Sequence, residues 1–209
     1  MDGGKLIARH DQLKAIREPW LSLWREVAPL VLPRQDDFFR SRSQADKRTA
    51  QMFDARAARA LEKFVAVLNA MLTPRANVWH KLKPKGGQEE SDPAVRWLEE
   101  VNERLWRLRY SPVANFASQQ DENYFSLGAF GTSVMFVDSS PTTPMRYRAC
   151  HLSEIVFAQD AWGSVNTVHR EFELTAAQAL QMFDPARVPE KIHAKAKTSP
   201  DETFTFIHC

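Results

Sequence analysis

Cysteine is nearly absent from this chain, which has 209 residues and two cysteines, Cys150 and Cys209. Neither lies in a CxxC pair or beside a histidine cluster, so a disulfide framework and a structural zinc site are unsupported. Apolar runs of membrane-spanning length are missing, and residues 1–5 lack the apolar core of a signal peptide. The composition fits a protein of a reducing compartment that buries its own hydrophobic core without covalent staples.

A large excess of charge of one sign is missing as well. The 28 basic and 26 acidic residues leave a net charge of +2, so any contact with nucleic acid has to come from a local patch. Two loops are candidates, residues 40–48 and residues 81–85. The first is either a solvated loop or a basic loop that touches phosphates, although Asp36, Asp37 and Asp46 dilute its charge. Its candidate DNA-contacting residues are Arg40, Arg42, Lys47 and Arg48.

The sequence motifs of common enzymes are also lacking. The glycines of residues 128–133 follow a predicted helix and precede a predicted strand, and no lysine accompanies them, which is the wrong order for a phosphate loop. The six histidines form no HExxH pair, and no serine lies in a GxSxG turn. Glu99 and Glu100 are adjacent and therefore point in different directions on a helix. We predict no catalytic residue, no cofactor-binding residue and no metal ligand.

Hydrophobic periodicity predicts helices in the first part of the chain, residues 1–131. The expected helices span residues 5–32, 49–72, 92–110 and 113–127, with a kink or break at Pro19 and an end of the first helix at Pro29 and Pro33. Residues 79–83 are expected to form a short strand. Gly128 and Gly131 are expected to end the last helix and to act as structural hinges, because glycine adopts left-handed backbone angles without strain.

The second part, residues 132–209, is predicted to be mainly β-structure with one helix at 175–184. Residues 132–137 lack polar alternation, which indicates an inner strand covered on both faces. Further strands are expected at 145–150, 154–158, 165–174 and 203–208, with a turn at 160–163 and one solvent-exposed face on 165–174. Residues 175–178 form a capping box, and 187–202 are either a linker or a short helix.

The predicted fold class is therefore α+β, with N-terminal helices packed on a small, mostly antiparallel sheet. The two parts are expected to form one continuous unit, and the strand pattern that runs to the last residues looks truncated. Aromatic residues are abundant, with six tryptophans and thirteen phenylalanines. Because aromatic residues are enriched at stable interfaces, we expect five tryptophans to be divided between the core and a subunit interface: Trp20, Trp24, Trp97, Trp106 and Trp162.

Five segments, taken in order, resemble the N-terminal part of the head-to-tail connecting (portal) proteins of short-tailed bacteriophages. Each segment alone is weakly specific, but their order and spacing extend across nearly the whole chain. One departure is that Ala55 and Arg56 stand where a serine-threonine pair is common in that family. The segments are Trp24–Pro29; Phe53–Ala58 with Leu68–Pro74 and Trp79; Leu127–Thr132; His151–Glu154 with Asp160–Gly163; and Phe172–Gln178.

The resemblance implies a structural subunit of a ring, typically dodecameric, at one vertex of the capsid. Double-stranded DNA passes through such a ring during packaging and ejection, and the packaging terminase, the tail adaptor and the capsid protein are its partners. It implies the wing region of the fold, a place in the virion after assembly in the host cytoplasm, and neither a cofactor nor a membrane. Two other functions remain open from the residues alone: a stand-alone nucleic-acid-binding module that uses loops 40–48 and 81–85, and an enzyme with a dispersed site.

Overall fold

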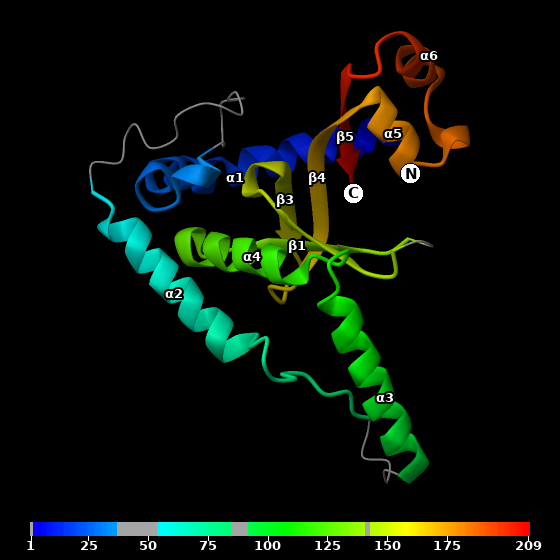
Figure 1. The fold of residues 1–209 in the computed structure, drawn as a ribbon. Coiled ribbons are helices and arrows are strands. Elements are labelled where there is room, and N and C mark those ends of the chain that lie inside the picture. The colour runs from blue at the N-terminus through cyan, green and yellow to red at the C-terminus, as the bar shows by residue number, and fades with distance from the viewer. Residues whose placement is uncertain (1, 37–53, 85–91, 141–142) are drawn as a thin grey trace. The chain divides into compact units, whose positions relative to one another are not determined.

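The computed structural model describes residues 2–36, 54–84, 92–140 and 143–209. Within these residues the chain forms six α-helices and five β-strands (Figure 1), which confirms the α+β class. The helices are α1 Gly3–Val31, α2 Arg56–Leu72, α3 Asp92–Arg109, α4 Phe116–Phe130, α5 Ala176–Met182 and α6 Glu190–Thr198. The strands are β1 Val134–Asp138, β2 Arg146–Cys150, β3 Ile155–Gln159, β4 Val165–Thr175 and β5 Thr203–His208. Short 3₁₀ turns lie at Pro33–Gln35, Leu152–Glu154 and Pro185–Arg187.

The chain divides into two compact units, and α1 contributes to both. Unit 1 combines the chain up to Trp20 with Ser153–Cys209, and unit 2 is Leu21–Leu152. α1 continues as one helix through Pro19 and Pro29 and ends at Val31, just before Pro33. A break at Pro19 and an end at Pro29 are therefore wrong, the end at Pro33 is confirmed, and a kink at Pro19 stays a prediction. Each proline removes a single backbone donor, and the hydrogen bonds of the neighbouring residues are enough to continue the helix.

Unit 1 has three layers built around the antiparallel sheet β3–β4–β5. α5 and α6 cover one face, where Leu174, Phe204 and Phe206 pack with a cluster of residues from both helices. The N-terminal part of α1 covers the other face through His10 and Lys14, which contact Glu171 of β4. Residues 187–202, left open between a linker and a helix, contain α6 and not only a linker.

Unit 2 packs helices against the antiparallel hairpin β1–β2, in which Val134 pairs with Cys150. Among the residues that the structure describes, β1 pairs with β2 alone, and Val137 is exposed, so the prediction of an inner strand covered on both faces is wrong. A two-stranded hairpin has two edges, and apolar composition alone does not supply a second partner strand. The expected strand at residues 79–83 is absent as well, because Trp79 and His80 contact side chains of α3 instead of pairing with another strand.

The packing of α2 against α4 places Leu61, Val65 and Tyr124 in one buried cluster. Gly128 lies inside α4 and does not end it, which corrects the prediction for that residue. A Cβ atom built on Gly128 would lie 2.7 Å from Leu61 Cδ1, so the glycine permits close approach of the two helices. Gly131 caps α4 with a φ of 72°, as predicted for a helix end.

Candidate functional site

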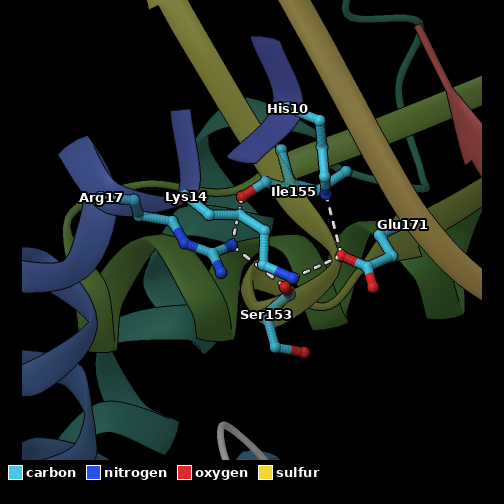
Figure 2. A network of polar contacts seen from close by, with 6 residues as sticks. All are labelled: His10, Lys14, Arg17, Ser153, Ile155 and Glu171. Carbon is cyan, nitrogen blue, oxygen red and sulfur yellow. Dashed lines mark hydrogen bonds and ion pairs between the residues drawn. The ribbon is translucent and has the colours of Figure 1, made fainter. Parts of the chain in front are cut away.

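One face of α1 carries three polar side chains, His10, Lys14 and Arg17, toward the sheet of unit 1 (Figure 2). Their spacing of four and three residues places them on the same side of a helix. Leu13 lies between them and is buried, so this side of the helix is an apolar contact with polar contacts around it. We call these three side chains, together with Glu171 and the backbone carbonyls of Ser153 and Ile155, the polar clamp.

The first half of the polar clamp is centred on one carboxylate oxygen of Glu171. His10 Nε2 and Lys14 Nζ each donate to Glu171 Oε2 over 2.8 Å. The hydrogen bond from Lys14, followed by that from His10, lowers the pKa of Glu171 below its ordinary value. Because the Lys14 and Glu171 side chains are partly exposed, this ion pair contributes at most about 1 kcal/mol to stability.

The second half of the polar clamp is Arg17, which reaches the beginning of β3. Its Nη1 donates to the carbonyl of Ser153 over 3.0 Å and to the carbonyl of Ile155. Burial lowers the pKa of Arg17 below the usual value, against the opposing effect of Glu18 and Glu171, and the guanidinium remains charged. Hydrogen bonds from a charged donor are stronger than neutral ones, so Arg17 fixes the position of α1 along the sheet.

Two histidines are stacked beside the polar clamp. The rings of His10 and His169 have centroids 5.7 Å apart and planes inclined by 12°. Only 2% of His10 and 3% of His169 is exposed. Burial, followed by the charges of His10 and Arg9, lowers the pKa of His169 below its ordinary value. On the adjacent position of β4, Arg170 forms an ion pair with Glu154 over 2.9 Å.

An aromatic cluster forms the second concentration of interacting side chains, in unit 2. Trp79 Nε1 donates to the hydroxyl of Tyr110 over 3.0 Å, and the rings of Trp106 and Tyr110 lie 4.4 Å apart. The guanidinium of Arg109 lies 4.7 Å from the centre of the Trp79 ring. Burial and the charge of Arg109 lower the pKa of His80, which stacks on Trp106. The cluster joins residues 79–80 to α3, and Phe116 extends it to α4.

The five tryptophans singled out from the sequence have very different environments. Trp24 is 6% exposed and lies in the core of unit 2 with Leu21 and Ala28. Trp106 is half-buried in the aromatic cluster. Trp20 and Trp97 are each 62% exposed, and Trp162 is 88% exposed at the β3–β4 turn. Their assignment to a subunit interface stays a prediction.

The basic residues predicted to touch DNA fall largely outside the part of the chain that the structure describes. Arg40, Arg42, Lys47 and Arg48 all lie outside the described residues, and Lys85 does too. Lys81 and Lys83 are described and exposed. The predicted contact with DNA therefore remains a prediction. The predicted role of Gly128 and Gly131 as hinges, a separate point, also stays a prediction.

Sequence reasoning missed the polar clamp because it assigned the face of β4 that carries His169 and Glu171 to solvent. That expectation is wrong, since α1 covers both residues. A usable signal was present: His10, Lys14 and Arg17 follow helical spacing, and His169 and Glu171 follow strand spacing. Polar side chains that complement each other on two amphipathic elements can mark a contact as well as apolar ones can.

No helix in residues 2–36, 54–84, 92–140 and 143–209 combines the length and hydropathy that crossing a membrane needs. Across the same ranges, no three histidine, cysteine, aspartate or glutamate side chains gather as metal ligands would.

The side chains that the structure brings together hold helices against sheets and against other helices. This is the arrangement of a structural α+β module. Comparison with known protein families identifies the class of protein more specifically. The profile of the family described as "Bacteriophage head to tail connecting protein" matches residues 4–209. The chain belongs to this family of bacteriophage head-to-tail connecting proteins.

Two curated phage proteins are similar to the chain. The "Probable portal protein" of Bordetella phage BPP-1 is 32% identical over 180 residues, which cover 85% of this chain and 32% of that protein. The "Portal protein" of Salmonella phage epsilon15 is 26% identical over 208 residues, which cover 98% of this chain and 37% of that protein. The chain thus spans about a third of the length of these relatives.

Proposed function

We propose that the chain is part of a portal subunit, a structural protein that stands beside copies of itself in a ring through which phage DNA enters and leaves the capsid. The match of the family profile to residues 4–209 carries this proposal. The two relatives, both described as portal proteins, support it. The proposed role is structural, with no residue assigned to catalysis.

The proposed ring needs two different flanks on each subunit, because a heterologous interface joins one patch to another. Exposed tryptophans are suitable anchors, since truncation of a large aromatic at an interface lowers affinity strongly. Trp97 on α3 and Trp162 in the β3–β4 turn are exposed and lie in different units. We assign these two residues, with Trp20, to the flanks of the proposed ring.

In the same proposal the ring, of about a dozen subunits as the family resemblance implies, occupies one vertex of the virion after assembly in the host cytoplasm. Its proposed partners are the capsid protein, the packaging terminase, the tail adaptor and double-stranded DNA. Antibodies raised against the chain should label a single vertex of phage particles in electron micrographs. Label spread over all vertices, or absent from particles that contain the protein, would overturn the placement.

Assembly can be separated from folding by three single variants of the phage subunit. Trp97→Ala and Trp162→Ala should reduce the ring fraction in mass photometry while leaving the urea unfolding midpoint nearly unchanged. Trp24→Ala is the matched control, because truncation of a buried tryptophan should lower the free energy of unfolding by about 3–5 kcal/mol. If neither exposed variant changes the ring fraction, the tryptophans are not interface residues. A subunit that stays monomeric at all concentrations would contradict the ring itself.

The basic loop 40–48 is proposed to contact the phosphates of the DNA. Replacement of Arg40, Arg42 and Arg48 by alanine should then reduce the slope of log binding constant against log salt by up to about 2.7, since each phosphate contact contributes about 0.9. The control replaces three exposed basic residues of α2 and its following turn, Arg59, Lys63 and Arg75. Equal slopes for the two triple variants would leave the loop without a role in DNA binding.

A further inference from the structure

The stacked imidazoles of His10 and His169 join α1 to β4. His10 donates from Nε2 to Glu171, which leaves its Nδ1 to accept a hydrogen bond. Nδ1 of His10 and Nδ1 of His169 are both buried, and neither has a hydrogen-bond partner among the described residues. A proton added at either Nδ1 would create a buried N–H group without an acceptor, which is unfavourable.

The charged and titratable groups around the pair come from every element that packs against it. α1 contributes the cations Arg9, Lys14 and Arg17, together with Glu18. β4 contributes Glu171 on the same face of the strand and Arg170 on the other. Glu154 precedes β3 and pairs with Arg170, and His208 of β5 lies opposite Arg170 in the sheet register. Glu171 already accepts from both His10 and Lys14, so a positive His169 imidazole would have no carboxylate of its own.

We propose that the His10–His169 stack is an acid-released latch, which holds the part of α1 in unit 1 on the β3–β4–β5 sheet at neutral pH and lets it detach as the His169 imidazole becomes protonated. A proton on His169 places a positive charge 5.7 Å from the His10 ring, in a buried site whose carboxylate, Glu171, already accepts from His10 and Lys14. Detachment exposes the His169 ring to water, where it carries its charge without this penalty.

The direction of the effect follows from His169. Its pKa in the folded state is lowered by burial and by the nearby charges of His10 and Arg9, whereas the detached state has the ordinary value of about 6.5. Between these two pH values the detached state binds more protons than the folded state. The attachment is therefore complete above pH 6.5 and weakens as the pH falls from there to the lowered value. For each additional proton that the detached state binds, the equilibrium constant for detachment rises by up to about tenfold as the pH falls by one unit.

The test compares wild-type chain, His169→Phe and His193→Gln. Phenylalanine keeps an aromatic ring on His10 and cannot gain charge. His193 is the matched control in unit 1. Its Nε2 donates a hydrogen bond to the carbonyl of Pro185, away from the stack. Hydrogen exchange is followed from pH 8 to pH 5 and converted to protection factors, with the amides of α1 before Trp20 as the probe and those of α4 in unit 2 as the internal reference.

In wild-type chain and in His193→Gln, protection of these α1 amides should fall by up to about tenfold per pH unit below pH 6.5, while α4 amides stay protected. In His169→Phe, the protection of α1 should be nearly independent of pH over this range. Equal pH profiles in wild type and His169→Phe would overturn the latch, and so would parallel loss of protection in α4.

A second measurement does not depend on the variant folding. An NMR titration of the wild-type imidazole carbons should give His169 a pKa below the ordinary histidine value of about 6.5. An ordinary value for His169 in the folded chain would contradict the proposal even if His169→Phe cannot be purified.

Discussion

Replacing Gly128 with alanine sets two opposite effects against each other. In the interior of a helix such as α4, alanine is favoured over glycine by about 1 kcal/mol. The added Cβ, however, would lie 2.7 Å from Leu61 Cδ1 and 3.1 Å from Phe64 Cδ1. Carbon atoms in contact prefer a separation of about 3.5–4 Å, so the Leu61 methyl group has to move by about 1 Å.

The overlap is expected to be the larger effect. Leu61 is buried between α2 and α4, so its side chain cannot turn into solvent to make room. Overpacking of a close-packed core costs about 1–3 kcal/mol, which exceeds the gain in helix propensity. We therefore expect Gly128→Ala to lower the free energy of unfolding by about 1–2 kcal/mol in urea titrations followed by circular dichroism.

A double-mutant cycle tests the cause of this loss. Leu61→Ala alone should cost about 2–5 kcal/mol, but in its background Gly128→Ala has room and should become neutral or stabilising by up to about 1 kcal/mol. Gly131→Ala is the control, because its cost of about 1–2 kcal/mol comes from a positive φ. Within the described part of the chain, no atom outside its chain neighbours lies within 4 Å of its Cβ position. That cost should be the same in both backgrounds. A stabilising Gly128→Ala in the wild-type background, or the absence of coupling to Leu61, would refute the reasoning.

Three further predictions concern unit 1. Arg17→Met should lower the free energy of unfolding by about 1–3 kcal/mol, because two backbone carbonyls lose their charged donor. Replacement of the exposed Arg9 by methionine should change the free energy of unfolding little. Equal effects of the two variants would contradict the role of Arg17. Thr175→Ala removes the capping box of α5 and should cost about 1 kcal/mol, measured by urea unfolding, and a change below the error of the titration would show that the cap is not needed. The pKa of Glu171 is lowered in the folded state, so the unfolded chain binds a proton at this carboxylate first, and stability should fall as the pH drops below about 4.5. Glu171→Gln should reduce this loss of stability in acid. An unchanged dependence of stability on pH in the variant would count against the ion pair.

The elements that the sequence predicted best are those fixed by neighbouring residues. Residues 203–208 form β5 with the expected bounds, and Thr175 and Gln178 exchange the two hydrogen bonds of a capping box. The turn of residues 160–163 closes with a hydrogen bond from Gly163 N to Asp160 O, and Gly163 has a positive φ of 82°. In the capping box and in the turn, the side chain or glycine that selects the local geometry is within three residues of the group it acts on. β5 instead pairs with the distant strand β4, and its bounds follow from its own run of β-favouring residues.

The predictions that failed required information from distant parts of the chain. Nothing near residue 128 shows that α2 comes within contact distance of its backbone, so the local sequence around Gly128 indicates a helix end. Residues 79–83 have a strand-like composition, but Trp79 and His80 contact Trp106 of α3 instead of a neighbouring strand. Tertiary contacts of this kind override local propensity.

The polar clamp shows why a polar face need not be a solvent face. An apolar contact between α1 and the sheet would tolerate sliding, because one methyl group can replace another. A shift of α1 by one helical turn, about 5.4 Å, would separate Glu171 from its two donors and Arg17 from its two carbonyls at once. The two backbone carbonyls would lose the charged donor that the half-buried Arg17 supplies, at a cost of about 1–3 kcal/mol, although the partly exposed Lys14–Glu171 pair contributes little net stability. The clamp therefore selects one register of helix on sheet, and in a family whose proposed role is to repeat the same subunit around a ring, a single register is what keeps each copy alike.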